Sequence, residues 1–307
     1  MPDPEPVHHR LTQWYRHAQR DLPWRREDCS AWGVFVSEVM LQQTPVQRVL
    51  PRWQEWMRRW PTPADCAAAG TAELLQVWDR LGYPRRALRL QQAAAAMVER
   101  HGGEVPADPD LLRALPGVGE YTAAAVACFA FGVPEVVVDT NIRRVHARVF
   151  AGDPLPGKTY TAQQRRLARD VFPDPEIDDG GLACTWNIAA MELGALVCTA
   201  ASPDCARCPV AQLCAWRAAG YPEPTEQQRG RGQPWAGTDR QVRGRIMAVL
   251  RQGVPVPRSE LLAQLGLPSA SAEQRARCLD SLLSDGLAET DGEQVALPGS
   301  LEPAASA

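Results

Sequence analysis

The sequence predicts an α-helical protein with a small α/β unit at its C-terminal end. Apolar residues recur at helical spacing through most of the first 217 residues, and no strand pattern appears before about residue 285. Two short strand-like runs, Leu287–Thr290 and Gln294–Leu297, flank Asp291 and Gly292, which favour a hairpin turn. The segment Pro222–Gly237 is rich in Pro, Gly, Gln and Arg, and this composition is typical of a linker between the two parts.

Proline residues and capping residues set the expected helix ends. Pro23 disfavours helix at the residue before it, so the first helix, within Arg10–Arg25, should end near Asp21. Pro45 and Pro51 should divide Ala31–Trp60 into two helices. Further helices are expected over Ala64–Gly70, Thr71–Leu81, Arg85–Glu99, a segment opened by Pro106–Pro109, Asn141–Phe150, Thr161–Val171 and Thr185–Cys198.

The C-terminal unit is expected to resemble a winged helix. Its helices should run from a cap at Thr238 or Asp239 to Arg251, from a cap at Ser259 to Leu265, and over Ala272–Ser284, followed by the hairpin. Winged helices bind DNA or protein, and some only pack, so the sequence leaves the role of this unit open.

Composition bounds the class of protein. The 307 residues, 45% of them apolar, suffice for two domains with buried cores. The polar N-terminus predicts no secretory signal or anchor, hence cytoplasmic localisation and no membrane. A net charge of −3 gives no overall attraction to nucleic acid, so DNA binding would depend on local arginine clusters. These clusters, which can also be solvated helix faces, are Arg48, Arg52, Arg58 and Arg59; Arg80, Arg85, Arg86 and Arg89; and Arg143, Arg144 and Arg148.

Four of the nine cysteines form a compact set. An odd number of cysteines without a signal peptide argues against a disulfide framework. The set has the spacing C-x6-C-x2-C-x5-C and consists of Cys198, Cys205, Cys208 and Cys214. Thiolate-only ligation in one loop suits an iron–sulfur cluster or zinc. The others, Cys29, Cys66, Cys128, Cys184 and Cys278, are expected to pack as small apolar groups.

The stretch from Leu115 to Asp139 combines a glycine turn, an apolar helix and a carboxylate. Gly117 and Gly119 bracket Val118 after Pro116, which predicts a tight turn because glycine enters the left-handed region at little cost. A helix should start near Tyr121, and its free N–H groups can bind a phosphate. The alternative is an ordinary structural connector. The interruptions at residues 132–135 favour a buried helix over a membrane span.

Glu38 is an anomaly in an apolar helix. It lies among Val34–Val36 and Val39–Leu41, and apolar surroundings favour the neutral carboxyl group that a general acid requires. The alternatives are a solvent-facing side chain or an ion pair with an arginine.

Five motifs together resemble one family. They are SEVMLQQTPV (Ser37–Val46), LGY (Leu81–Tyr83), LPGVGEYTA (Leu115–Ala123), VDTNIRRV (Val138–Val145) and the four-cysteine spacing. In this order they resemble the helix-hairpin-helix DNA glycosylases of the endonuclease III superfamily, and within it the MutY-type adenine DNA glycosylases, over about residues 10–217.

The resemblance implies a two-lobed, all-α fold with DNA and the active site between the lobes. The expected domains are a six-helix barrel with the helix-hairpin-helix at 24–134, an iron–sulfur cluster domain at 1–23 and 135–217, a linker at 218–237 and the winged-helix-like domain at 238–300. It also implies a [4Fe–4S] cluster on the four cysteines, with Arg207 on the surface of a basic loop. Zinc is the alternative metal.

The resemblance further implies how an N-glycosidic bond would be hydrolysed. Glu38 would protonate the departing adenine, Asp139 would stabilise or trap the sugar cation, and Tyr121 and Asn141 would orient this pair. Endonuclease III enzymes carry a lysine at the position of Tyr121, and a tyrosine cannot form their Schiff base. We therefore expect a monofunctional glycosylase.

Further positions match DNA-contacting and base-pocket residues of the family. Gln43 and Tyr83, called here the wedge residues, would insert into the duplex from which the base is flipped. Other DNA contacts would be Thr44, Arg86 and the hairpin residues Pro116, Gly117, Val118 and Gly119. The base pocket would consist of Arg20, Trp24, Arg25, Leu41 and Ile188. Trp24 and Tyr83 can alternatively be ordinary core aromatics.

Two departures from the family bear on specificity. Ile188 stands where familiar relatives carry Gln or Glu, and an apolar side chain cannot hydrogen-bond the adenine edge. The chain also has the winged-helix-like unit where many relatives have a Nudix-like domain that recognises 8-oxoguanine. The leading hypothesis is a monomeric enzyme acting on double-stranded DNA with adenine opposite 8-oxoguanine or guanine. The alternatives are a glycosylase for another base, such as thymine opposite guanine, and a non-catalytic iron–sulfur protein that binds DNA or senses redox state.

Overall fold

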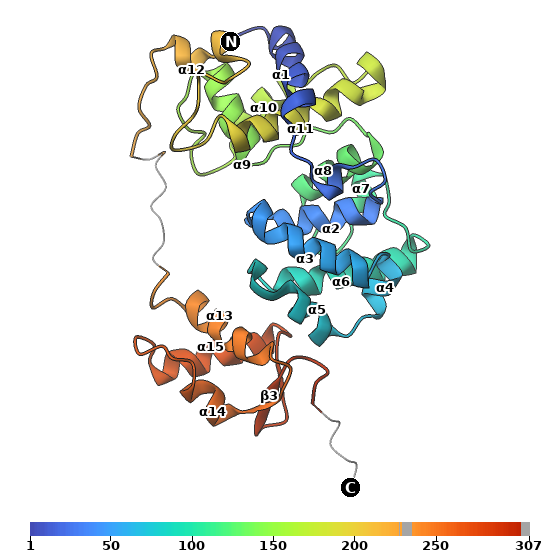
Figure 1. Ribbon diagram of the computed structural model, residues 1–307, viewed down its shortest axis with the longest axis vertical. Coiled ribbons are helices and arrows are strands. Elements are labelled where there is room, and N and C mark those ends of the chain that lie inside the picture. The colour runs from blue at the N-terminus through green and yellow to red at the C-terminus, as the bar shows by residue number, and fades with distance from the viewer. Residues whose placement is uncertain (227, 229–234, 302–307) are drawn as a thin grey trace. The chain divides into compact units, whose positions relative to one another are not determined.

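The structure of the chain is a computed structural model, and it describes residues 1–226, 228 and 235–301 (Figure 1). Part of the linker predicted over Pro222–Gly237 lies outside these residues. The chain forms two compact units. The first consists of Met1–Val34, Ala107–Ala114 and Val118–Arg231, and the second of Phe35–Pro106, Leu115–Gly117 and Gly232–Ala307. The predicted fold class, helical with a small C-terminal sheet, is confirmed.

The main helices of the first unit share one apolar core. Its elements are α1 Pro4–Ala18, η1 Pro23–Arg25, α7 Pro109–Arg113, α8 Glu120–Phe131, α9 Thr140–His146, the π-helical turn η3 Ala147–Ala151, α10 Ala162–Asp170, η4 Ile177–Gly180, α11 Gly181–Leu196, η5 Ala211–Leu213 and α12 Ala215–Ala218. Helix α11 packs on both α1 and α9. Leu11, Ile142, Trp186 and Leu193 are buried in this core, which fixes α9 and its preceding carboxylate.

The second unit contains a helical layer rich in tryptophan. Its helices are α3 Val46–Arg59, α4 Pro63–Ala68, α5 Thr71–Trp78, η2 Asp79–Leu81 and α6 Arg85–Arg100, together with most of α2 Ala31–Leu41, which crosses into this unit at Phe35. The ring of Trp56 packs edge-on against Trp60 at 4.7 Å and Trp78 at 5.9 Å between centroids. Trp78 Nε1 of this cluster donates to Gly82 O at 2.9 Å and so anchors the segment after α5.

The same unit includes a C-terminal subdomain, residues 238–301. It consists of α13 Asp239–Leu250, β1 Val256–Pro257, α14 Arg258–Ala263, α15 Ala272–Ser284, β2 Glu289–Thr290 and β3 Gln294–Ala296. The strands form an antiparallel sheet in the order β1-β3-β2, in which Val295 pairs with both Val256 and Thr290. The predicted hairpin is therefore confirmed. The expectation of no strand before about residue 285 is wrong, because β1 precedes α14 and joins the sheet through β3.

Several predicted helix ends are corrected. Helix α1 begins at Pro4, because the Asp3 side chain accepts a hydrogen bond from Glu5 N at 3.1 Å and caps this end. The helix ends at Ala18. Pro51 lies inside α3 and does not end it, because the buried side chains of Val49, Trp53 and Trp56 hold the helix by packing and offset the cost of the proline. Helix α14 begins after Pro257, whose pairing in the sheet fixes its start, and Ser259 is inside the helix and does not cap it.

Two expectations about small residues also change. Gly117 has φ +79°, as expected for the turn, but Gly119 is extended at φ −101° and caps α8, so only one of the two glycines uses the left-handed region. Cys29 is partly exposed, whereas the other four scattered cysteines are buried. Among the described residues, no helix combines the length and apolar character needed to cross a membrane.

Candidate active site and cysteine cluster

Glu38 is a carboxylic acid buried in the apolar helix α2. Glu38 is 6% exposed, and its sequence neighbours Phe35, Val39 and Met40 are also buried. This burial excludes the alternative in which Glu38 points to solvent. Its role as an acid stays a prediction.

Asp139 caps α9 and is held by two hydrogen bonds. Its Oδ1 accepts from the backbone N–H of Ile142 at 2.6 Å, and its Oδ2 accepts from Asn141 Nδ2 at 2.8 Å. Burial raises the pKa of Asp139, while these two hydrogen bonds and the charge of Arg144 act in the opposite direction. The Asp139 carboxyl group is therefore held in a fixed orientation, and burial makes its ionisation costly.

Asn141 connects this carboxylate to Arg144. The Arg144 side chain donates from Nη2 to Asn141 Oδ1 at 2.9 Å and to Gly194 O at 2.6 Å. Its Nε donates to Cys198 O at 2.7 Å. A continuous set of hydrogen bonds therefore runs from Asp139 to the first cysteine of the cluster loop. Arg144 was predicted only as part of a basic cluster; its position three residues after Asn141 on one helix face was the available signal.

Gly194 lets α11 approach α9 at Asn141. A Cβ built on Gly194 would lie 2.6 Å from Asn141 Cβ and 3.0 Å from both its Cα and its carbonyl oxygen. Real Cβ atoms do not approach other atoms so closely, so a side chain at Gly194 would displace Asn141. Sequence reasoning did not single out Gly194; a glycine inside a helical pattern was the available signal.

Arg20 and Arg25, two residues predicted for the base pocket, share one buried carboxylate. Glu192, in α11, is fully buried and accepts from Arg20 Nε at 2.8 Å, Arg20 Nη2 at 2.7 Å and Arg25 Nη2 at 2.9 Å. Burial alone would raise the pKa of Glu192, but the two guanidinium groups outweigh it and lower the pKa to about 2. Arg25 Nη1 is buried without a hydrogen-bond partner within the described structure. Sequence reasoning missed Glu192, although a lone acid in an apolar helix was the signal that marked Glu38.

The other residues predicted for the base pocket and for catalysis are divided between the two units. Tyr121 in α8 and Ile188 in α11 pack, partly buried, against the core of the first unit, where Trp24 in η1 is 6% exposed. Leu41 is the last residue of α2 in the second unit. Their roles stay predictions.

The two wedge residues share an unusual backbone. Gln43 has φ +56° and Tyr83 has φ +47°, values that side-chain-bearing residues rarely adopt. Both are exposed, Tyr83 by 49%. Such strain persists only where the surrounding structure holds it, and it is frequent at functional sites.

Thr44 and Arg86 join the two wedge segments. Thr44 is buried, and its Oγ1 donates to Leu81 O at 3.0 Å. Arg86 Nη1 donates to Val39 O at 2.9 Å and Gln42 O at 2.6 Å, and its Nη2 donates to Gly82 O at 3.1 Å. Burial lowers the pKa of Arg86 to about 10. The guanidinium group predicted to contact DNA is thus occupied with carbonyl groups inside the protein.

The helix-hairpin-helix turn presents an exposed glycine. Gly117 packs against the Arg89 side chain, whose Cβ would lie 2.8 Å from a Cβ at position 117. Pro116 and Val118 are partly exposed, and Gly119 caps α8 with open space around it. This geometry leaves backbone N–H groups accessible at the start of α8.

The four predicted cysteine ligands line one cavity of the first unit. The cavity has an empty volume of about 360 Å³, including space open to solvent, and Leu193, Val197 and Trp216 also line it. All four cysteines are free thiols, and burial raises the pKa of Cys208 to about 12. Among the described residues, no three His, Cys, Asp or Glu side chains are gathered as ligands of a single metal ion.

Arg148 contacts the loop that begins at Cys198. It is 3% exposed, and its Nη1 lies 3.3 Å from Cys198 Sγ and donates to Thr199 O at 2.7 Å. Its guanidinium group stacks on Trp216 at 4.6 Å. Thiolates are the form in which cysteines ligate metals. The four free thiols on one cavity and this cation fit a thiolate-ligated group. Arg207 is exposed, as predicted, with its side chain 80% accessible.

Comparison with known proteins identifies the family. Residues 36–169 match the model of the HhH-GPD superfamily base excision DNA repair protein. The chain is 50% identical over 281 residues to an adenine DNA glycosylase of Mycolicibacterium smegmatis, with 91% of each chain covered. It is 48% identical over 292 residues to an adenine DNA glycosylase of Mycobacterium tuberculosis, covering 94% of this chain and 92% of the relative.

The chain belongs to the adenine DNA glycosylase family. It is accordingly a base excision repair enzyme that cleaves an N-glycosidic bond, and DNA is its partner. The MutY-type resemblance predicted from the sequence is confirmed. The solved structure of a thermostable thymine-DNA glycosylase has a similar fold. The TM-score is 0.62 at 26% sequence identity, and the match covers 70% of this chain and 97% of that chain.

Proposed function

We propose that the enzyme removes adenine paired with 8-oxoguanine or guanine by hydrolysis alone, without cutting the strand. The observation that carries the proposal is the orientation of Asp139, whose carboxylate is fixed by Ile142 N and Asn141 Nδ2 and destabilised by burial. A destabilised anion gains most from a developing positive charge, and this is the charge that appears on the sugar as the bond breaks.

The proposed reaction has two steps. Glu38 gives its proton to a ring nitrogen of the flipped adenine while the C1′–N9 bond breaks, and the bonding electrons leave with the base. Asp139 stabilises the resulting sugar cation, and Asn141 and Tyr121 orient the Asp139 carboxylate. Water then adds its oxygen to C1′ and gives up a proton to the Glu38 carboxylate, which restores the acid and leaves an abasic site in an intact strand.

A single lysine in the chain supports the monofunctional assignment. Strand cleavage by a glycosylase needs an amine that forms a Schiff base with the sugar. The 307 residues contain one lysine, Lys158, and it is exposed in the loop before α10, while Tyr121 stands at the position where the relatives with lyase activity carry theirs. We expect no covalent adduct with DNA on borohydride reduction. An adduct that survives Lys158→Arg would point to the N-terminal amine.

The proposed DNA contacts are the wedge residues and the hairpin. Gln43 and Tyr83 would enter the duplex from strained, exposed positions that Thr44 and Arg86 hold together. The hairpin Pro116–Gly119 and the start of α8 would bind a phosphate, because its N–H groups have no helical partners. Arg20, Trp24, Arg25, Leu41 and Ile188 would form the base pocket, with Arg20 and Arg25 held in place by Glu192.

We further propose that Cys198, Cys205, Cys208 and Cys214 hold a [4Fe–4S] cluster. The cluster would supply four metal–thiolate bonds that fix the loop carrying Arg207. Iron and acid-labile sulfide in the purified protein, both lost in Cys205→Ser, are the expected result. Stoichiometric zinc without sulfide would overturn this assignment.

A second candidate activity is removal of thymine opposite guanine. It is favoured by Ile188, which cannot hydrogen-bond the adenine edge. One experiment tests both activities: the enzyme is incubated with duplexes that differ only in one mispair, and alkali then reveals abasic sites. Release from the adenine strand opposite 8-oxoguanine or guanine supports the proposal. Release confined to thymine would replace it with the second candidate.

A further inference from the structure

The segment Asp79–Arg85, which joins α5 to α6 and carries Tyr83, has a strained backbone. Asp79 has φ +43°, Tyr83 has φ +47° and Gly82 has φ +81°. Two residues with side chains therefore occupy the left-handed region within five positions. Strain of this kind costs on the order of 1–3 kcal/mol per residue and requires support from outside the segment.

The C-terminal subdomain contacts this segment at three points within the second unit. Arg251 Nε lies 3.8 Å from Asp79 Oδ1 at its start. The Arg240 guanidinium group lies over the Tyr83 ring at 5.8 Å from its centroid. Asp285 forms an ion pair with Arg85 at its end. The support thus reaches both ends of the segment and its exposed aromatic ring.

Each of the three contacts is reinforced by a second arginine. Asp79 also accepts from Arg52 Nη2 at 2.8 Å, and Asp285, 8% exposed, accepts from Arg243 Nη2 at 2.6 Å. The Tyr83 ring also contacts the Arg86 guanidinium group, 5.6 Å from its centroid. Two cations therefore contact the ring, one from α6 and one from α13, and restrict its orientation.

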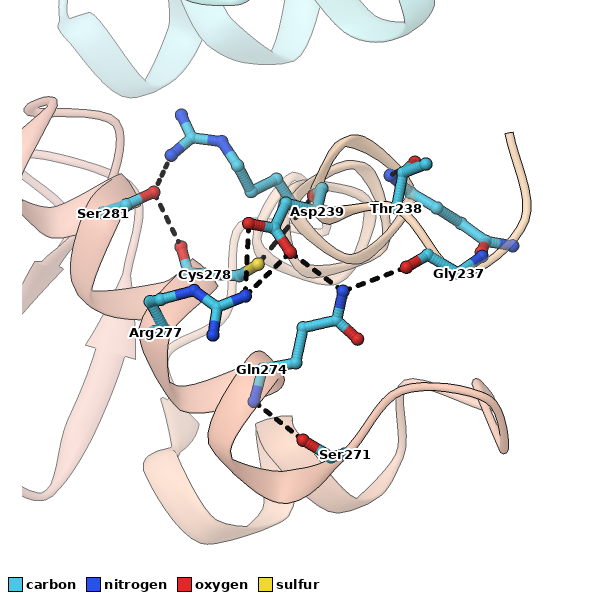
Figure 2. A network of polar contacts seen from close by, with 10 residues as sticks. Gly237, Thr238, Asp239, Ser271, Gln274, Arg277, Cys278 and Ser281 are labelled. Atoms are coloured by element: carbon cyan, nitrogen blue, oxygen red, sulfur yellow. Dashed lines mark hydrogen bonds and ion pairs between the residues drawn. The ribbon is translucent and has the colours of Figure 1, made fainter. Parts of the chain in front are cut away.

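The first turn of α13, which carries Arg240, is itself fixed by α15, as Figure 2 shows. Gln274 Nε2 donates to Gly237 O at 3.0 Å and to Asp239 Oδ1 at 2.8 Å. Arg277 Nη2 donates to the same Asp239 oxygen at 3.1 Å. Because the residue before Arg240 is held by two side chains of α15, Arg240 starts from a defined position.

The charges of the subdomain do not fit an independent DNA-binding module. Residues 238–301 contain eight acidic residues and seven arginines, whereas a duplex-binding module presents a local patch of basic side chains that are free to contact phosphates. Five of these arginines bond to other groups of the protein: Arg243, Arg251, Arg258, Arg275 and Arg277. Three of the subdomain's arginines, Arg240, Arg243 and Arg251, serve the contact with segment 79–85.

We propose that the C-terminal subdomain is a clamp on segment 79–85 and that Arg240 is a positioning residue for Tyr83. The clamp holds the ring ready for insertion into the duplex, so its effect on adenine release acts through Tyr83. This inference rests on the proposed wedge role of Tyr83.

A double-mutant cycle on the full-length enzyme tests the proposal. Single-turnover adenine release is measured for the parent, Arg240→Ala, Tyr83→Ala and the double variant. We expect Arg240→Ala to slow release about fivefold to tenfold in the parent and less than about twofold in the Tyr83→Ala background. Arg240→Lys, which keeps a cation for the ring, should restore most of the rate. Equal slowing in both backgrounds would overturn the clamp.

Arg245→Ala is the matched control, because Arg245 is an exposed arginine of the same helix with no contact to the segment among those the structure describes. It should release adenine at the parent rate. Hydrogen exchange gives a readout independent of activity: amides 79–86 should exchange about tenfold faster in Arg240→Ala and Arg251→Ala than in Arg245→Ala. Unchanged exchange would overturn the clamp.

The outcomes separate this inference from the proposed function. No adenine release by the parent on any mispair contradicts the proposed function. Parent-like release by Tyr83→Ala contradicts its wedge role and the inference with it. Slow release by Tyr83→Ala together with parent-like release by Arg240→Ala overturns the clamp alone.

Discussion

Gly194 and Asn141 are in such close contact that no side chain fits on Gly194. A Cβ there would lie 2.6 Å from Asn141 Cβ. The helix pair α9 and α11 therefore depends on this glycine for the position of the amide that holds Asp139.

We expect Gly194→Ala to displace Asn141 and slow adenine release by about 10²-fold, because small displacements of catalytic groups have effects of this size. Overpacking should also cost about 1–3 kcal/mol of stability. Gly244→Ala in α13 is the matched control, since a Cβ at Gly244 has nothing within 4 Å. That variant should be stabilised by about 0.5–1 kcal/mol. Single-turnover kinetics and thermal unfolding measure both, and parent-like release by Gly194→Ala would contradict the assignment of Asn141.

Asp139→Asn should abolish adenine release without loss of stability. Asparagine is an equally good helix cap, so α9 should remain intact. Because burial raises the pKa of Asp139, the folded protein bears a cost once pH exceeds that pKa, and the neutral variant does not. We expect a Tm at pH 7 equal to or above that of the parent and of the exposed control Asp170→Asn. A markedly lower Tm would mean that the carboxylate is structural.

The parent's release rate should fall as pH drops through the raised pKa of Asp139, because only the carboxylate stabilises a cation. Rates measured at saturating enzyme from acidic to neutral pH check this. A release rate that stays constant as the pH falls to the ordinary pKa of an aspartate side chain would argue against a catalytic role of Asp139.

Glu38→Gln should slow adenine release by about 10²- to 10⁴-fold, the usual contribution of a general acid. Glutamine has the same shape but no proton to transfer. Binding of the mispaired duplex, and its decline with salt, should stay close to those of the parent because phosphate contacts dominate both. Full activity of Glu38→Gln would show that another group supplies the proton.

Glu192→Gln should destabilise the protein by on the order of 3 kcal/mol at pH 7, the value that corresponds to a pKa lowered from 4.5 to about 2. A lowered carboxyl pKa gives stability above the unfolded pKa that is lost as pH falls through the folded one. The difference between the two proteins should therefore shrink between about pH 4.5 and pH 2. Urea unfolding across this range measures it, with exposed Glu99→Gln as the control. A difference independent of pH would contradict the role of the charge.

Arg86→Met should cost about 2–4 kcal/mol, because it leaves several carbonyl oxygens without donors. Arg100→Ala at the exposed end of the same helix should change stability by less than about 0.5 kcal/mol. Similar unfolding curves for the two variants would show that Arg86 acts in DNA binding rather than in the fold.

The sequence marked candidate site residues where a local pattern singles them out. Glu38 was recognisable because an acid interrupts an apolar helix, and the four cysteines because their spacing is short and regular. The pairing of Arg20 and Arg25 with Glu192 joins residues 172 and 167 positions apart, and no local pattern records such a distance. The start of α1 at Pro4 was missed because its cap, Asp3, lies in a polar segment with little apolar periodicity.

The bonds of Thr44 and Arg86 have a kinetic consequence for DNA scanning. Since the carbonyl groups of Gln42 and Gly82, directly before Gln43 and Tyr83, both accept from the Arg86 guanidinium group, we expect the two wedge side chains to move together. They should then enter and leave the duplex in one event, without a stage in which only one is inserted. Residence times of single molecules on a mispair should follow one exponential.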